Sequence, residues 1–333
     1  MTKTYGKITG WGAYAPDNIV TNHDMAERYD TSHDWIVQRT GIAERRFAVP
    51  GETTRQMAVT AGQQALDSAG LTGADLDLII VTTTSPDYMA PALSSQVQSS
   101  LGADDVPAFQ LMTGCSGFVY ALTTAYQFIE SGAYGTILVV AAEYMSRYLA
   151  AADRSSAILF GDGAGAVVIQ ATDKPCGLKG FELGSDGAQG HNLVISMGES
   201  HEIEQVWPHN GNKFQAYMNG REVFKFASRV VGRSCFKTLA QAGMTFDDID
   251  WILPHQANLR IIQSAAKAMN IPVEKFLVNI DRYANTSAAS VPLLMVEYLE
   301  NGTIKPTDTV LMVAFGSGLT WGSAIVQLQP EEA

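Results

Sequence analysis

Cys115 is the side chain of this sequence best placed to act as a nucleophile. It lies in the run Thr-Gly-Cys-Ser-Gly, after an apolar, strand-like stretch at 107–112 and before a helix-like stretch at 118–130. A sulfur at the start of a helix is close to free backbone N–H groups and to the positive end of the helix dipole, which stabilise a thiolate. Lone cysteines are nevertheless more often small buried hydrophobic residues. The residue types alone leave both interpretations open.

His255 differs in its position from the other five histidines, which lie in polar or irregular context. It comes after an apolar strand at 249–253 and precedes a helix-like stretch at 258–269. The carboxyl ends of strands are where open α/β sheets bind ligands. The pattern therefore makes His255 a candidate site residue, and a purely structural histidine fits the same pattern.

Two glycine-rich turns lead into different kinds of segment. The turn at 315–322, which contains Ser317, comes after an apolar strand and can either expose backbone N–H groups as an oxyanion hole or simply reverse the chain. The turn at 160–166 leads into a strand and not into the helix that a dinucleotide-binding turn requires. We predict a structural role for this second turn.

An internal repeat organises these segments. Ala-Gly-Leu-Thr at 69–72, followed by an apolar strand, reappears as Ala-Gly-Met-Thr at 242–245, again followed by an apolar strand. Each copy reads as a helix, a glycine C-cap, a loop and a buried strand. The sequence therefore predicts two half-chains of similar α/β pattern, at 1–170 and 171–333, with irregular connecting material at 171–217.

A second match, between 128–132 and 298–302, sets the offset between the copies at 298 − 128 = 170 residues. The same offset takes Cys115 to Asn285, in Asn-Thr-Ser-Ala-Ala-Ser, which also precedes a helix-like run. Pseudo-twofold symmetry would bring these two helix starts together at the centre of the molecule. Apolar strands alternating with helices predict an α/β fold of largely parallel, buried sheets, and we expect the two halves to pack as one five-layered αβαβα body.

Composition narrows the class of protein. The chain has 333 residues, 46% of them hydrophobic, and a formal net charge of −12, which argues against nucleic-acid binding. Its three cysteines have no CxxC spacing, which argues against a disulfide framework or a metal site. With no signal-type N-terminus and no apolar run of about 18 residues, we expect a cytoplasmic protein without a membrane segment.

One basic stripe interrupts this acidic composition. Its members recur every four residues through a helix-like segment, which places them on one face; they are Arg221, Lys225, Arg229, Arg233 and Lys237. This face is either simply solvated or a docking surface for an acidic partner.

Taken together, four motifs resemble those of the β-ketoacyl-acyl-carrier-protein synthase III family, the initiating condensing enzymes of fatty-acid synthesis, which have the thiolase fold. They are Gly-Cys-Ser-Gly-Phe at 114–118, His-Gln-Ala-Asn-Leu-Arg at 255–260, Asn-Thr-Ser-Ala-Ala-Ser at 285–290 and Phe-Gly-Ser-Gly at 315–318. The likeness also covers 35–41, 153–154 and 218–224. Position 317 departs from the family pattern, which has glycine there.

The resemblance implies a decarboxylating Claisen condensation. Cys115 would take an acyl group from acyl-CoA, and His255 and Asn285 would hold the thioester oxygen of malonyl-acyl-carrier protein while it loses carbon dioxide. The backbone N–H groups of Cys115 and Ser317 would form the oxyanion hole. The product would be a 3-oxoacyl-acyl-carrier protein, and no metal or redox cofactor is expected, since the coenzyme A thioester is a substrate.

The resemblance also implies two binding surfaces and a homodimer. Trp35 and Arg154 would stack on the adenine of coenzyme A; the other expected coenzyme A contacts are Arg39, Phe224 and Asn258. The expected carrier-protein contacts are Lys225, Gln256, Ala257, Asn258, Leu259 and Arg260. In the family a residue near 88–91, supplied by the partner subunit, limits the acyl pocket; if Ala90 occupies that position, primers longer than acetyl should fit.

Several alternatives compete with this interpretation. A papain-like protease also uses Cys, His and Asn, but it places the cysteine near its N-terminus and has no α/β repeat. A thiolase proper would need a second cysteine where this chain has Ser317, and elongating condensing enzymes pair their cysteine with two histidines. Related acyltransferases or ketosynthases of secondary metabolism remain open, as does, more remotely, a non-catalytic acyl-carrier-binding module.

Overall fold

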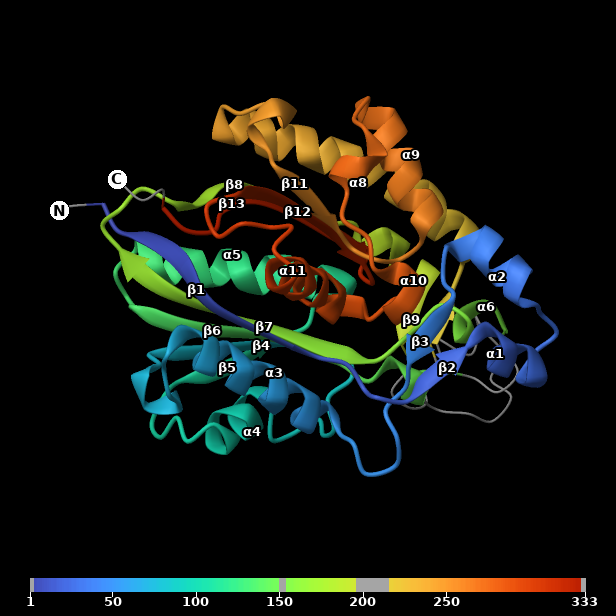
Figure 1. Cartoon of the computed structure of the whole chain (residues 1–333), viewed down its shortest axis with the longest axis horizontal. Coiled ribbons are helices and arrows are strands. Elements are labelled where there is room, and N and C mark those ends of the chain that lie inside the picture. The colour runs from blue at the N-terminus through green and yellow to red at the C-terminus, as the bar shows by residue number, and fades with distance from the viewer. Residues whose placement is uncertain (1–2, 150–153, 196–215, 331–333) are drawn as a thin grey trace.

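The computed structural model describes residues 3–149, 154–195 and 216–330. Two sheets and three layers of helices alternate through the molecule (Figure 1). The first sheet draws its strands from residues 5–172 and the second from residues 177–327. The expected boundary between residues 170 and 171 therefore lies inside the last strand of the first sheet.

The first sheet has the strand order β1-β7-β6-β4-β5, in which β4 runs parallel to β5 and β6. β7 runs antiparallel to both of its neighbours. The strands are β1 (Tyr5–Tyr14), β4 (Leu78–Thr82), β5 (Ala108–Leu111), β6 (Thr136–Glu143) and β7 (Gly163–Thr172). β4 and most of β6 are buried throughout, which explains their unbroken apolar sequence.

The second sheet has the order β11-β12-β13-β8, in which β11 and β12 run parallel and the other two pairings are antiparallel. Its strands are β8 (Gly177–Ser185), β11 (Trp251–Pro254), β12 (Thr309–Gly316) and β13 (Thr320–Gln327). The expectation of largely parallel sheets is therefore wrong, because β7 in the first sheet and β13 in the second each run antiparallel to both neighbours. The expectation that 171–217 is irregular is wrong for β8, which forms an edge of this sheet. β8 is half-buried and contains glycine and charged residues, so its sequence lacks the apolar run that marks the other strands. Residues 196–215 lie outside the described part.

Helices cover both outer faces and fill the space between the sheets (Figure 1). The outer helices on the first sheet are α3 (Thr54–Ala69) and α4 (Leu93–Ser100), and those on the second are α8 (Gly220–Ala242) and α9 (Leu259–Met269). The central layer consists of α5 (Gly117–Glu130) and α11 (Ser290–Glu300). Their buried side chains join those of both sheets in one core. The five layers expected from the sequence are thus confirmed.

The repeat corresponds to real local structure. Gly70 ends α3 with φ 69° and Gly243 ends α8 with φ 67°, both left-handed. Each helix is followed by a 3₁₀ turn in which a threonine and an aspartate form a capping box, at Thr72 and Asp75 in one copy and at Thr245 and Asp248 in the other. A left-handed cap position favours glycine, which is why the sequence predicts this part of the pattern.

Shorter elements gather at one end of the sheets, on the right of Figure 1. They are β2 (Ile19–Thr21), α1 (Asn22–Arg28), α2 (His33–Thr40), β3 (Glu44–Arg46), α6 (Arg154–Ala157), β9 (Leu193–Ile195), β10 (Ala216–Met218) and α10 (Ile280–Tyr283). The buried Arg45 ties this end together, because its guanidinium donates to Val20 O, Asn22 Oδ1 and Ile158 O. Burial lowers the pKa of Arg45 to about 10.

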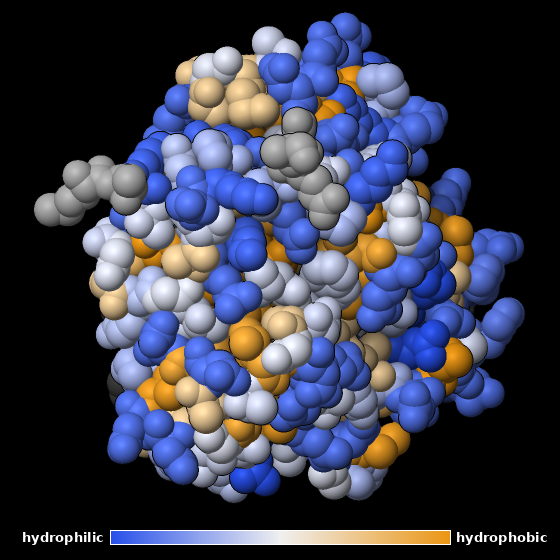
Figure 2. Space-filling view, turned by 60° about the vertical axis from the view of Figure 1, so that its left-hand side comes forward, coloured by the Kyte–Doolittle hydropathy of each residue, from blue (hydrophilic) through white to orange (hydrophobic). Residues whose placement is uncertain are grey.

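The face turned toward the chain ends is mainly hydrophilic, with hydrophobic residues scattered among polar ones (Figure 2). Scattered apolar residues of this kind are usual on protein surfaces. Within the described residues, no helix has both the length and the apolar character needed to cross a membrane.

Candidate active site

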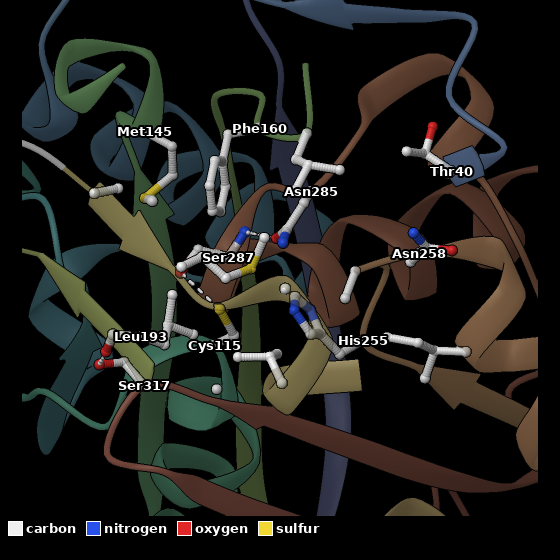
Figure 3. Close-up of a pocket in the computed structure, with 18 of the residues that line it drawn as sticks. Thr40, Cys115, Met145, Phe160, Leu193, His255, Asn258, Asn285, Ser287 and Ser317 are labelled. Carbon is white, nitrogen blue, oxygen red and sulfur yellow. Dashed lines mark hydrogen bonds between the residues drawn. The ribbon is translucent and has the colours of Figure 1, made fainter. Parts of the chain in front are cut away.

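Cys115 and Asn285 lie at corresponding helix starts in the central layer. Cys115 is in a 3₁₀ turn (Gly114–Ser116) that leads into α5, and Asn285 directly precedes Thr286 and the 3₁₀ turn (Ser287–Ala289) that leads into α11. The two turns are in contact, as the 170-residue offset predicts. Together with His255, which comes directly after β11, both residues line a cavity of about 360 Å³. Figure 3 shows the three side chains directed toward a common space.

The Cys115 thiol is nearly enclosed, with 8% of the residue exposed. It donates a hydrogen bond to Ser287 Oγ at 3.4 Å. Burial raises the pKa of Cys115 to about 12; the hydrogen bond with Ser287 opposes this shift and the charge of Glu143 adds to it. Burial thus opposes the thiolate form that a helix start favours. The sulfur rests as a thiol.

His255 is held as a neutral imidazole. Its Nδ1 lies 2.6 Å from Ser290 Oγ, which also accepts a hydrogen bond from Gln256 N at 3.4 Å. In the tautomer whose Nδ1 accepts the Ser290 hydroxyl proton, the ring proton lies on Nε2. Burial lowers the pKa of His255 to about 3. The ring thus offers a neutral N–H donor, packed edge-on against Phe315.

The Asn285 amide is oriented by its neighbours. Its Oδ1 accepts a hydrogen bond from Ser287 N at 2.8 Å, so the Nδ2 donors remain for the cavity. Its backbone is hydrogen-bonded to the start of the glycine-rich turn at 160–166 and to the residue before it. Asn285 N donates to Leu159 O, and Asn285 O accepts from Gly161 N. That turn therefore positions Asn285, in keeping with the structural role predicted for it.

The C-terminal glycine turn packs directly on Cys115. A β-carbon added at Gly316 would lie 2.5 Å from Cys115 N, and one added at Gly114 would lie 2.8 Å from Ser317 N. The backbone amides of Cys115 and Ser317 therefore belong to two closely packed loops. Serine is tolerated at 317 because its φ is not positive, and its hydroxyl donates to Leu193 O at 2.8 Å.

The cavity is also lined by residues of α2 and α8 and by the start of α9 with its N-cap, among them Trp35, Arg39, Phe224 and Asn258. The guanidinium of Arg154 lies 4.9 Å from the Trp35 ring centroid and that of Arg39 lies 5.7 Å from it. Asn258 caps α9, and its Nδ2 donates to Arg39 O at 3.1 Å, which ties α2 to α9. Thr40 and Asn258 lie away from Cys115 in Figure 3.

Comparisons with known proteins agree with this arrangement. Family models described as 3-oxoacyl-[acyl-carrier-protein (ACP)] synthase III and its C-terminal region match residues 109–187 and 239–328. The chain is 45% identical, over 96% of its length and 98% of the relative, to a β-ketoacyl-[acyl-carrier-protein] synthase III of Bacillus anthracis. The chain belongs to this family. It is an acyl-transferring condensing enzyme, and it catalyses the initiating condensation of fatty-acid synthesis.

Solved structures of synthase III proteins confirm the thiolase-like fold. The chain resembles 3-oxoacyl-[acyl-carrier-protein] synthase III of Aquifex aeolicus VF5 with a TM-score of 0.90 and 41% identity, covering 97% of this chain and 99% of that one. It also resembles the priming β-ketosynthase of the R1128 polyketide pathway, with a TM-score of 0.91 and 34% identity, covering 99% of this chain and 98% of that one.

One residue expected on the carrier-protein surface lies elsewhere. Gln256 is fully buried; its side chain donates to Pro254 O and Leu277 O and accepts from Asn279 N. It cannot contact a docked protein, because its side chain is buried and hydrogen-bonded to the backbone of Pro254, Leu277 and Asn279. Its neighbours in the expected surface remain at least partly accessible; these are Ala257, Asn258, Leu259 and Arg260.

The basic stripe is exposed along α8, as its spacing predicts. Two of its members are paired with carboxylates: Lys225 Nζ lies 2.7 Å from Glu222, and Lys237 Nζ lies 3.1 Å from Glu182. At the end of α8 nearest the cavity, Arg260 of α9 lies over the Phe224 ring. The positive charge of the stripe thus extends to the edge of the cavity.

Sequence reasoning missed three residues that contact the site. Ser287 and Ser290 stand in the Asn-Thr-Ser-Ala-Ala-Ser motif, and Glu143 ends β6. The available signal for Glu143 was a carboxylate at the carboxyl end of a fully apolar strand. For the two serines the motif gave no indication of which side chain faces which partner.

Proposed function

We propose that this enzyme transfers the acyl group of an acyl-CoA primer to Cys115 and condenses it with malonyl-acyl-carrier protein. The observation that carries the proposal is a thiol sharing one cavity with two uncharged side chains that can donate N–H groups, the His255 imidazole and the Asn285 amide. The products are a 3-oxoacyl-acyl-carrier protein, carbon dioxide and coenzyme A. Family membership supports the reaction class, and the site geometry supports the assignment of residues.

In the first half-reaction the Cys115 sulfur attacks the thioester carbonyl of the primer. The carbonyl oxygen becomes an oxyanion, which the backbone N–H groups of Cys115 and Ser317 would stabilise. The carbon–sulfur bond to coenzyme A then breaks and leaves the acyl group on Cys115. The mainly apolar lining and the low exposure of Cys115 would limit the access of water that could hydrolyse this thioester.

In the second half-reaction the malonyl group loses carbon dioxide. The electron pair of the broken bond passes to the thioester oxygen, and an enolate forms. Two neutral N–H donors can stabilise the negative charge that develops on this oxygen. Because the donors are uncharged, they form no ion pair with the substrate before that charge develops. The enolate carbon then attacks the acyl-Cys115 carbonyl, and the Cys115 sulfur leaves. Written this way, the reaction needs no metal or redox cofactor.

Coenzyme A binding is proposed at Trp35, Arg39, Arg154, Phe224 and Asn258. The contact of Arg154 with Trp35 supports a site for a flat aromatic ring, since guanidinium and indole faces both stack on such rings. At their present separation of 4.9 Å the two groups are in direct contact. They would have to move apart to admit an adenine between them.

Carrier-protein docking is proposed at the α8 stripe and the start of α9, with Lys225 and Arg260 as the main cations. This surface is supported by its charge, its exposure, its position at the cavity edge and the acidity expected of the carrier. Gln256 is excluded from it by burial. Ala257, Asn258 and Leu259 contribute the remaining contacts.

A homodimer is proposed through β5, the terminal strand of the first sheet. Edge strands leave backbone groups available for pairing with a second chain. Exposed apolar side chains flank this edge: Met89 is 81% exposed and Met112 is 57% exposed. A partner seated here would also bring its 88–91 segment toward the neighbouring cavity, where a small Ala90 would leave room for primers longer than acetyl.

A second candidate, priming of polyketide synthesis, is favoured by the 34% identical priming β-ketosynthase. The 45% identity to the β-ketoacyl-[acyl-carrier-protein] synthase III of Bacillus anthracis ranks the first candidate above it.

The test is intact-protein mass spectrometry after mixing with acetyl-, branched- and medium-chain acyl-CoA, followed by addition of malonyl-acyl-carrier protein. We expect an acyl adduct on the wild type and none on Cys115→Ala, then release of carbon dioxide as the adduct disappears. An unmodified wild-type protein would refute the covalent mechanism. Adduct loss without carbon dioxide release would indicate plain acyl transfer.

A further inference from the structure

We propose that Ser287 and Glu143 form a proton relay that takes the thiol proton of Cys115 during acylation, stores it on Glu143 while the acyl group is bound, and returns it afterwards. The inference rests on the proposed function, because it assumes that Cys115 is the nucleophile. Ser287 contacts the reacting sulfur, whereas Glu143 acts through Ser287.

The three groups form one continuous chain of hydrogen bonds. Cys115 Sγ donates to Ser287 Oγ at 3.4 Å, shown dashed in Figure 3, and Ser287 Oγ donates to Glu143 Oε1 at 3.0 Å. Each donor in the chain already points toward the next acceptor. A proton can therefore move from sulfur to carboxylate through one hydroxyl, without rearrangement of heavy atoms.

Ser287 is held in this position at a conformational cost. Its φ is 51°, a left-handed conformation that is unfavourable for residues other than glycine. Its N–H donates to Asn285 Oδ1 and its hydroxyl is fixed between Cys115 and Glu143. Unusual backbone conformations of this kind persist where surrounding contacts enforce them, and they concentrate at functional sites.

Glu143 is a fully buried carboxyl whose neighbours are uncharged donors. Besides Ser287, it accepts hydrogen bonds from Thr84, Ser85 and Ala288 N. Among the described residues, no ion pair involves Glu143. Burial raises the pKa of Glu143, against the lowering effect of the bonds from Ser85, Thr84 and Ser287. A carboxylate without a cation partner is a better proton acceptor than a salt-bridged one.

The alternative proton acceptor at the site is poorly suited. Burial lowers the pKa of His255 to about 3, so its imidazole has little affinity for a proton. Its Nδ1 is also occupied by Ser290. Transfer to Glu143, in contrast, keeps the total charge of the buried pair at one negative charge, because a thiol and a carboxylate become a thiolate and a carboxylic acid. The proton transfer therefore creates no second buried charge.

Each proton in the relay is accounted for. The S–H bond of Cys115 breaks as its proton binds Ser287 Oγ, and the Ser287 proton passes to Glu143 Oε1. The thiolate attacks the primer, and the departing coenzyme A thiolate takes a proton from solvent. After condensation the Cys115 thiolate leaves, and the Glu143 proton returns to it through Ser287. While the acyl group is bound, Glu143 is neutral.

The relay makes a measurable prediction: acylation takes up one proton from solvent per acylated Cys115. If the thiol proton instead passed to coenzyme A, no net uptake would occur. We would mix enzyme and acyl-CoA in weak buffer with a pH indicator, and count adducts by mass spectrometry. Uptake of about one proton per adduct is expected; adduct formation without uptake would overturn the storage step.

Two variants test the path itself. Ser287→Gly removes the hydroxyl and suits the left-handed backbone, so it should fold, and Glu143→Gln removes the acceptor. In single-turnover acylation both should be slower by roughly 10²-fold or more. Their rates should rise about tenfold per pH unit, since hydroxide must now take the proton, while the wild type stays nearly flat around neutral pH.

Asp162→Asn is the matched control. Asp162 is also fully buried and accepts hydrogen bonds from Ala48 N and Ser146, but none links it to Cys115. It should keep the flat profile of the wild type even if its stability falls. Wild-type-like rates and profiles in both Ser287→Gly and Glu143→Gln would overturn the relay alone. Absence of any adduct on wild-type Cys115 would instead overturn the proposed function.

Discussion

Gly316 lies against the backbone of Cys115, with no room for a side chain between them. A β-carbon at 316 would lie 2.5 Å from Cys115 N and 2.8 Å from Cys115 Cβ. The glycine turn and the turn bearing the nucleophile are therefore one packed unit, although they are about 200 residues apart in the sequence.

Gly316→Ala should consequently displace Cys115. We expect a loss of about 1–3 kcal/mol in the free energy of unfolding from overpacking, and a larger proportional loss of acylation because the oxyanion hole is disturbed. Urea unfolding and adduct formation measure the two effects. Gly187→Ala, where an added β-carbon meets nothing within 4 Å, should leave both unchanged; equal effects in the two variants would contradict this account.

Ser290→Ala should impair decarboxylation more than acylation. Without the Ser290 hydroxyl, the His255 ring can place its proton on Nδ1 and lose the Nε2 donor. We expect carbon dioxide release to fall roughly tenfold or more, with adduct formation close to that of the wild type. Nitrogen NMR of the imidazole reports the tautomer directly. An unchanged tautomer together with normal carbon dioxide release would contradict the role given to Ser290.

His255 should make folding stability dependent on pH. Its pKa is about 3 in the folded protein and near 6.5 when unfolded, so the unfolded state binds a proton first as pH falls. Stability contributed by the neutral ring is complete above about pH 6.5 and is lost between there and about pH 3. His255→Gln should reduce the loss between about pH 7 and pH 4.5 by on the order of 3 kcal/mol, measured by urea unfolding. An equal loss in both proteins would refute the depressed pKa.

Arg260→Glu should weaken carrier-protein use selectively. Reversing an exposed charge at the cavity edge should raise KM for malonyl-acyl-carrier protein about tenfold, with a smaller difference at high salt. KM for acyl-CoA should change little in comparison. Lys174→Glu makes the same change in net charge on a loop between β7 and β8. If it had the same effect, total charge and not a docking site would be responsible.

Met112→Glu should separate the proposed homodimer. A charge beside the β5 edge would face the partner chain, and burying it unpaired is costly. Light scattering coupled to size-exclusion chromatography should show a shift toward monomer. Val273→Glu, at an exposed apolar residue on the 3₁₀ turn Val273–Lys275 after α9, should not shift the mass. A monomeric wild-type protein would contradict the proposed homodimer.

Local rules made much of this protein predictable from its sequence. Helix ends at Gly70 and Gly243 result from the left-handed caps that glycine allows, and buried strands are marked by unbroken apolar runs. The repeat related Cys115 to Asn285, because equal spacing in two similar halves implies equal positions. Those inferences depend only on residue types and their spacing along the chain, so the sequence contains what they require.

Tertiary packing decided what local rules cannot specify. Gln256 turns inward although its motif suggested a surface, and burial keeps Cys115 a thiol although it stands at a helix start. The contacts of Ser287 with Glu143 and of Ser290 with His255 join segments 144 and 35 residues apart. Burial and long-range hydrogen bonding depend on how whole layers pack, so the sequence determined which groups are available and the fold determined which of them meet.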